Sequence, residues 1–164
     1  MIKKLISGGQ RGADQAGLAV GVDLGIETGG TAPLGYRTKN GDNPKLAKLG
    51  LVESPTRNYA TRTFDNAKDS DGTMRFAYNF FSAGEVLTLK AIRQYKKPFF
   101  DVNLADIENK EVFIFDVLDW FKENNIEVLN VAGNAGETQE EASKIFKLVR
   151  DMLSHFIKKY NEGY

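Results

Sequence analysis

Residues 126–138, Ile-Glu-Val-Leu-Asn-Val-Ala-Gly-Asn-Ala-Gly-Glu-Thr, are the stretch that decides the fold. The apolar residues 126–132 predict a buried strand, and the small residues that follow predict a loop. From Ala142 to Phe156, apolar residues recur at steps of three and four, which is the period of a helix that buries one face. The stretch therefore predicts a strand, a small-residue loop and a helix in succession.

The same succession occurs twice more along the chain. Residues 3–7 predict a strand that ends in the glycine loop Gly8–Asp14, and a helix follows to Leu24. A strand at 72–80 meets a second helix across Ser82–Glu85. Short strands at 26–28 and 97–102 and a helix at 111–124 continue the alternation. Strands that alternate with helices predict an α/β domain with a mostly parallel sheet and right-handed crossovers.

Residues 34–71 interrupt this regular pattern. They show no clear periodicity, apart from one possible helical turn at 45–49 and a short strand at 51–53. Between Leu34 and Arg75 there are eight basic and five acidic residues. A long irregular segment in a compact domain is either a binding loop or lid, or a solvated surface loop. With 164 residues, we expect one domain over 1–164 that includes this segment.

Composition excludes several classes of function. Lys plus Arg and Asp plus Glu both number 22, so no net charge draws the chain to nucleic acid or to a membrane surface. The chain has no cysteine and a single histidine, His155, which excludes the usual zinc and thiolate sites, and we expect no metal. No apolar run reaches a membrane span of about 18 residues. The absence of cysteine fits a reducing cytoplasm.

Three loops are candidates for a binding site. The carboxyl ends of parallel strands share one edge of a sheet, so the loops at 8–14, 82–85 and 133–138 are expected to converge on one crevice. Glycine lets the backbone approach a ligand, and the amino terminus of a helix favours a phosphate. None of the loops matches a dinucleotide or P-loop fingerprint. The polar candidates in these loops are Gln10, Arg11, Asp14, Ser82, Glu85, Asn134 and Thr138.

Two interpretations of the first loop remain open. Asp14 favours the positive end of its helix, and Arg11 then lies solvated beside it. Alternatively, Gln10 and Arg11 reach a bound anion or base. The residues alone do not separate these readings.

Five segments occur in order along almost the whole chain: Ser7–Asp14, Gly29–Arg37, Tyr59–Asn66, Asp69–Thr73, and Ser82–Glu85 with Thr88. In these segments the chain resembles the molybdenum-cofactor carrier family, a circularly permuted branch of the SLOG superfamily. The resemblance implies a Rossmann-like three-layer fold with helices on both faces of the sheet, and a homo-oligomer. It implies that a nucleotide-derived or phosphate-bearing ligand is bound by Gly8, Gly9, Gln10, Arg37, Arg62, Asp71, Thr73, Gly84 and Glu85.

The chain departs from the family pattern at one loop. Ala83 and Glu85 stand where many members have a second glycine and a threonine. The related lonely-guy enzymes cleave nucleotide monophosphates at a P-G-G-x-G-T-x-x-E loop, which residues 82–85 do not reproduce. Other SLOG modules are sensors of nucleotide second messengers, so binding without turnover has precedent in the superfamily.

The leading hypothesis is therefore a non-catalytic protein that holds an anionic nucleotide-derived molecule. It either sequesters a second messenger such as a cyclic ADP-ribose derivative, as a phage anti-defence protein would, or carries the molybdenum cofactor. The alternative is a phosphoribohydrolase-like enzyme in which Glu85 or Glu137 acts as acid or base and Arg62 clamps the phosphate. The cargo is then the cofactor or the nucleotide derivative, and a resident cofactor is not implied.

Overall fold

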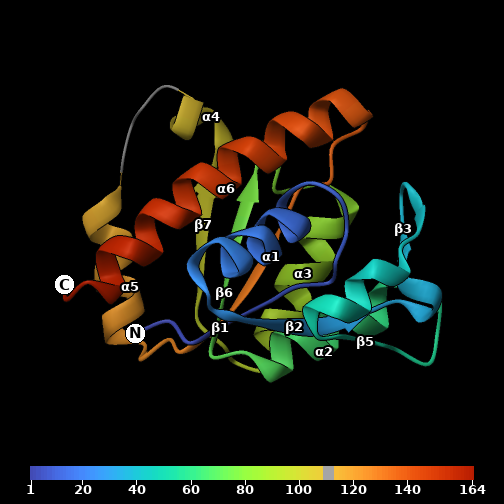
Figure 1. Cartoon of the computed structure of the whole chain (residues 1–164), viewed down its shortest axis with the longest axis horizontal. Helices are drawn as coiled ribbons and strands as arrows, with labels where there is room; N and C mark the ends of the chain where they lie inside the picture. Colours follow the sequence, from blue (N-terminus) through green and yellow to red (C-terminus); the bar gives the residue numbers. More distant parts are fainter. Residues whose placement is uncertain (109–112) are drawn as a thin grey trace.

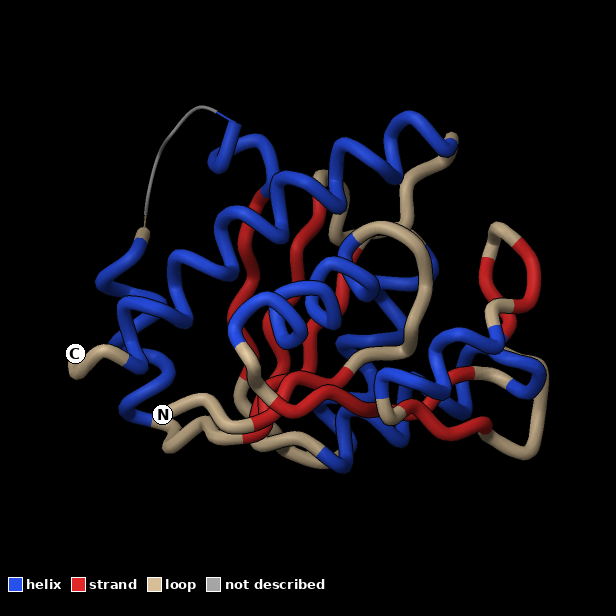
Figure 2. The backbone as a smooth tube through the Cα atoms, viewed as in Figure 1, coloured by secondary structure: helices blue, strands red, loops and turns tan. Residues whose placement is uncertain are grey.

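The computed structural model describes residues 1–108 and 113–164, and its centre is a parallel sheet (Figures 1 and 2). The sheet has six strands in the order β5-β2-β1-β8-β6-β7. Every adjacent pair is parallel, which confirms the predicted α/β class. The strands are β1 (Lys4–Ile6), β2 (Glu27–Ala32), β5 (Leu51–Glu53), β6 (Gly72–Ala77), β7 (Phe99–Asn103) and β8 (Val128–Gly133).

Helices cover both faces of this sheet, as expected for a Rossmann-like fold. Figure 1 shows α1 (Ala13–Leu24) and the long α6 (Gln139–Asn161) crossing in front of the strands. The short α4 (Leu104–Glu108) and α5 (Ile114–Glu123) pack against α6. On the other face, α2 (Tyr59–Asp69) and α3 (Ala83–Gln94) pack against each other. Residue 111, where we expected the helix at 111–124 to begin, lies outside the described residues.

The segment 34–71 is more regular than its sequence suggested. It contains the 3-10 turns η1 (Leu34–Tyr36) and η2 (Pro44–Leu49), and the small hairpin of β3 (Arg37–Thr38) and β4 (Gly41–Asp42). The helical turn at 45–49 and the strand at 51–53 are confirmed. The expectation of an irregular stretch up to Asp71 is wrong, because α2 occupies 59–69.

Strand pairing brings three of the predicted loops together. Ile6 in β1 lies opposite Asn130 in β8, and Asn130 lies opposite Thr73 in β6. The three strands therefore run side by side, and the loops that leave their carboxyl ends emerge at one edge. Within the two described ranges, no helix is long and apolar enough to cross a membrane.

Candidate functional site

A cavity of about 460 Å³ opens at the carboxyl edge of the sheet. Gln10 and Asp14 border it from the β1–α1 loop and α1, residues 82–85 from the start of α3, and residues 133–137 from the β8–α6 loop. This confirms that the three loops converge. The β3–β4 hairpin and the first turns of α2 complete the wall.

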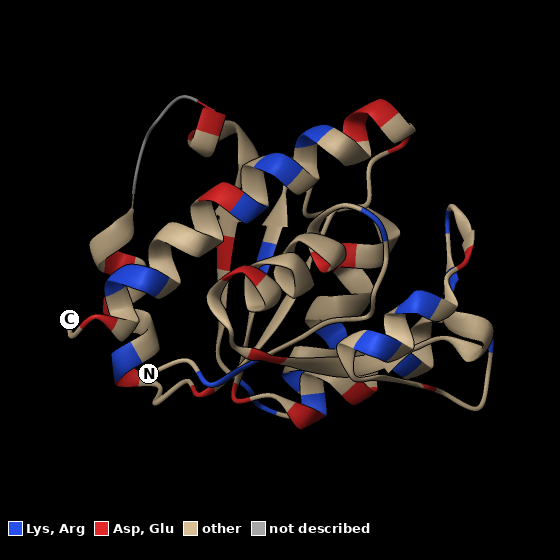
Figure 3. Ribbon diagram, viewed as in Figure 1, with Lys and Arg blue, Asp and Glu red and all other residues tan. Residues whose placement is uncertain are grey.

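The charges around the cavity are mixed rather than mainly positive. Figure 3 shows acidic residues at the start of α6 and basic residues on the β3–β4 hairpin and α2. The lining carries four carboxyl groups and two cationic groups: Asp14, Glu85, Glu137, Glu141, Lys39 and Arg62. A negatively charged ligand would therefore be bound by Lys39 and Arg62, on one side of the cavity.

Arg62 is the cation at the floor of this cavity. It stands on the first turn of α2, and its guanidinium lies over Gly8, 2.5 Å from where a side chain at that position would begin. Its side chain is only 15% exposed. Across the described residues the guanidinium makes no hydrogen bond, its Nε is buried without a partner, and its Nη1 is 3.7 Å from Asp14 Oδ2. The guanidinium is thus held by packing, by the ring of Tyr59 and by charge, with Nε buried and its terminal nitrogens free to donate.

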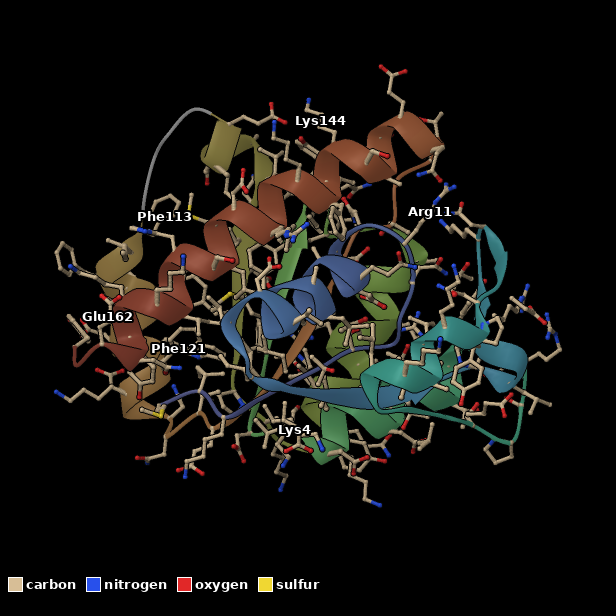
Figure 4. All side chains as sticks on the ribbon, in the orientation of Figure 1. Lys4, Arg11, Phe113, Phe121, Lys144 and Glu162 are labelled. Atoms are coloured by element: carbon tan, nitrogen blue, oxygen red, sulfur yellow. The ribbon has the colours of Figure 1, made fainter. Side chains whose placement is uncertain are left out.

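In Arg11, by contrast, each of the three guanidinium nitrogens donates a hydrogen bond within the protein. Its Nε donates to Ala135 O at 3.2 Å, its Nη2 to Gly136 O at 2.8 Å and its Nη1 to Asn40 Oδ1 at 2.9 Å. Figure 4 shows it between the start of α6 and the hairpin. The structure thus gives Arg11 the role of joining loops.

Gln10 also stabilises this arrangement. Its Oε1 accepts hydrogen bonds from the backbone N–H of Lys39 at 2.8 Å and of Arg11 at 3.1 Å. Its carboxamide oxygen therefore anchors the β3–β4 hairpin, which carries Lys39 to the cavity wall.

Asp14 is a buried carboxyl group beside Arg62. Its Oδ2 accepts a hydrogen bond from the backbone N–H of Gln10 at 3.2 Å. Burial, helped by the nearby Glu85, raises the pKa of Asp14 to about 6 against the opposing effects of Arg62 and the backbone donors. Asp14 therefore titrates close to the neutral range.

The amino termini of α6 and α3 differ, although both carry the sequence signature of a capping box. At α6, Thr138 Oγ1 accepts from Glu141 N at 3.1 Å, and Glu141 Oε2 accepts from Glu137 N at 3.4 Å. At α3, Ser82 Oγ instead donates to Glu85 Oε2 at 2.7 Å, and the first turn has no side-chain cap. Of these two helices, only α3 begins at the cavity with first-turn backbone N–H groups that no side chain caps.

Glu85 is 5% exposed and is held by two loops. Besides the bond from Ser82, its Oε2 accepts one from Asn134 Nδ2 at 2.9 Å. Asn134 in turn accepts from the backbone N–H of Tyr78 through Oδ1 at 2.9 Å. The carboxylate of Glu85 is thus fixed in orientation at the cavity wall.

Four of the predicted site residues do not line the cavity and instead have roles in the fold. Asp71 lies at the other edge of the sheet, where Oδ2 accepts from Val128 N at 2.8 Å, so the expectation that it lines the site is corrected. Thr73 is fully buried in β6 against Asn130. Gly9 faces Leu46, because a side chain there would meet that residue at 2.7 Å. Thr138 caps α6.

Arg37 occupies an intermediate place. Its guanidinium lies 4.6 Å from the centre of the Tyr59 ring, and Arg62 lies 5.5 Å from the same ring. Tyr59 itself lines the cavity. Arg37 itself does not line the cavity, which corrects the expectation from the sequence; it lies behind the ring of Tyr59.

Sequence reasoning missed several lining residues. They come from the hairpin, from α2 and from the β6–α3 loop: Lys39, Tyr59, Thr63, Tyr78 and Asn79. The available signal was the segment Tyr59–Asn66, in which only Arg62 was singled out. A helix there would have placed Tyr59, Arg62 and Thr63 on one face, three and four residues apart.

Residues 5–157 match the sequence pattern of one protein family. The chain belongs to the circularly permutated YpsA SLOG family. It is also similar to a solved crystal structure of a proposed molybdenum carrier protein from Syntrophus aciditrophicus SB. The two chains are 35% identical, the match covers 95% of each, and the TM-score is 0.81. A search of curated proteins found no significant match.

These findings confirm the resemblance and the Rossmann-like fold inferred from the sequence. They support a role in binding or carrying a ligand. In the described part of the chain, His, Asp and Glu side chains nowhere gather in the group of three that a metal ion would need.

Proposed function

We propose that this SLOG protein binds an anionic, nucleotide-derived small molecule in the cavity and holds it without turnover. The observation that supports this is Arg62, a largely buried guanidinium with no hydrogen bond among the described residues. Buried polar groups in folded proteins are normally hydrogen-bonded, because an unpaired one loses its hydration without compensation. A phosphate would satisfy this fork and match its charge.

The rest of the cavity fits a ligand of this class. Its volume of about 460 Å³ lies in the range typical of small-molecule sites. Lys39 adds a second positive charge, and the rings of Tyr59 and Tyr78 offer flat surfaces against which a heterocycle can pack. The carboxyl groups on the α6 side can accept hydrogen bonds from amino or hydroxyl groups of the same ligand.

Binding without turnover is favoured by what surrounds the carboxylates. Glu85 is fixed by Ser82 and Asn134, and Asp14 is fixed by a backbone N–H and faces Arg62. The hydroxyl of Ser82 shares Glu85 Oε2 with the amide of Asn134, so this carboxylate serves as a fixed acceptor that joins two loops. The carrier role follows the name of the similar protein, whereas sequestration of a second messenger is the other use of the same pocket.

The test uses AMP, GMP, CMP and UMP as probes, with native mass spectrometry of the protein from its source cells to reveal a retained ligand. Arg62→Ala should weaken binding of the tightest probe about 10- to 100-fold, because a charge-assisted hydrogen bond contributes roughly 1.5–3 kcal/mol. Arg62→Lys should be intermediate, because it keeps the charge and loses the fork. Calorimetric titration measures all three proteins.

Arg93→Ala is the matched control, because Arg93 is an exposed arginine near the end of α3. Equal affinity of the wild type and Arg62→Ala, or no binding of any probe and no retained ligand, would contradict the proposal. Release of free base that depends on Glu85 or Glu137 would instead support the phosphoribohydrolase alternative.

A further inference from the structure

The two carboxyl oxygens of Glu85 differ in their hydrogen bonds. Its Oε2 accepts two hydrogen bonds, from Ser82 and Asn134. Its Oε1 accepts none from the described residues; the residue as a whole is 5% exposed, but this oxygen is not among the fully buried unpaired atoms, and the residue lines the cavity. Nor is a cation paired with the carboxylate in the described part of the chain. This oxygen, Oε1, is therefore available to a hydrogen-bond donor on a ligand that enters the cavity.

The neighbouring Arg75 does not supply that donor. It donates to both oxygens of Asp101 at 2.7 Å, and its Nη1 donates to the backbone oxygen of Glu85 at 2.8 Å. Its charge is therefore already paired, and it stabilises the backbone of α3 beneath the carboxylate. This leaves Oε1 of Glu85 as an acceptor that faces the cavity.

Glu85 and Arg62 both line the cavity, and the structure places them near each other. A small hollow beneath the cavity is lined by Arg62 and Asp14 together with Thr88, which is one turn along α3 from Glu85. Asp14 is close enough to both Arg62 and Glu85 for each to influence its pKa. A ligand with its phosphate on Arg62 thus brings its nearest atoms, rather than its far end, to Glu85.

In a nucleotide, the polar groups nearest the phosphate are the hydroxyls of the sugar, while the base is farther away. A sugar hydroxyl is a donor to a carboxylate oxygen. We propose, on the basis of the proposed function, that Glu85 accepts a hydrogen bond from a sugar hydroxyl of the bound nucleotide. Glu85 is then a specificity-determining residue that selects nucleotides carrying this hydroxyl over the deoxy analogue that lacks it.

The size of the selection follows from the chemistry of a buried acceptor. A site that is built to hydrogen-bond a hydroxyl rejects the analogue that lacks it, because the buried acceptor is left unpaired. One hydrogen bond to a charged group corresponds to about a 10- to 100-fold change in affinity. Ser82 and Asn134 hold the acceptor in place, so weakening this support should reduce the discrimination.

The experiment compares the tightest-binding nucleoside monophosphate with its 2′-deoxy and 3′-deoxy analogues by calorimetric titration. The wild-type protein should bind at least one deoxy analogue about 10-fold or more weakly. Glu85→Ala should bind the ribonucleotide and both analogues with similar affinity. Ser82→Ala keeps the carboxylate and should show intermediate discrimination, which provides a readout if Glu85→Ala does not fold.

Glu140→Ala is the control for the loss of a nearby carboxylate, because Glu140 is exposed in the first turn of α6. It should discriminate as the wild type does. Equal binding of ribo and deoxy forms by the wild type, or discrimination retained in Glu85→Ala, would overturn the inference and leave the proposed function intact. Failure of every nucleotide to bind would overturn both.

Discussion

The carboxyl group of Asp14 couples the stability of this protein to pH. Its pKa in the folded state is about 6, above its ordinary 3.8, because burial disfavours the charged form. The folded state therefore holds this proton more tightly than the unfolded state. The resulting stability is fully present below about pH 4 and is lost as the pH rises through about 6, with a magnitude on the order of 3 kcal/mol.

Asp14→Asn removes this titration and keeps a side-chain acceptor for Gln10 N. We expect the free energy of unfolding of the variant, relative to the wild type, to rise as the pH increases from 4 to 7. Urea unfolding at several pH values measures this difference, in which the contributions of other titrating groups cancel. A difference that stays constant over this interval would refute the assignment of the shifted pKa to Asp14.

Arg11 and Arg62 show which part of the site the sequence could predict and which part it could not. Arg11 and Arg62 were both candidates, since each is a basic residue in a family segment. Only the structure separates them, because Arg11 finds backbone carbonyls in the distant β8–α6 loop while Arg62 finds none. Long-range hydrogen bonds of this kind have no local sequence signal.

At the level of elements, the strand–loop–helix units followed directly from the pattern of apolar and small residues. Gly133 ends β8 and has a positive φ of 148°. A side chain there would begin 2.0 Å from Phe76 O, and the backbone on both sides is fixed by the sheet. Gly84, in the first turn of α3, has open space at the same position.

These two glycines allow a matched prediction. Gly133→Ala should lower the free energy of unfolding by at least about 2 kcal/mol, through steric overlap and backbone strain. Gly84→Ala should leave it unchanged or raise it by up to about 1 kcal/mol, because alanine favours a helix. Chemical denaturation of both variants provides the comparison. Equal stability of Gly133→Ala and the wild type would contradict the close approach of β6 and β8.

The pattern of apolar residues did not predict helix α2. It presents few apolar residues, and one polar side chain ties it to the sheet: Asn66 accepts from Thr31 N at 2.8 Å and donates to Thr31 O at 2.9 Å. Ala60, Phe64 and Ala67 do recur at helical steps, and Phe64 and Ala67 pack against α3, but this stripe is short and two of its three residues are alanine. Because α2 carries Arg62 and Tyr59, missing it also hid one wall of the site.

On the scale of the whole molecule, the cavity joins parts of the chain that are far apart in sequence. The β1–α1 loop, the start of α2, the β6–α3 loop and the β8–α6 loop all border it. A ligand that contacts these segments binds only the folded state, so it stabilises the entire domain by mass action.

We therefore expect a nucleotide at 100 times its dissociation constant to add about 2.7 kcal/mol to the free energy of unfolding. For a chain of this size, that corresponds to a rise in Tm of roughly 5 to 11 °C. Hydrogen exchange should show slower exchange in all four segments together, because one guest orders them at once, and amides that exchange only through global unfolding should slow by the added stability. Calorimetry and exchange mass spectrometry measure the two effects on the same sample. Slower local exchange confined to a single loop would mean that the ligand contacts the surface of that loop and leaves the shared cavity empty.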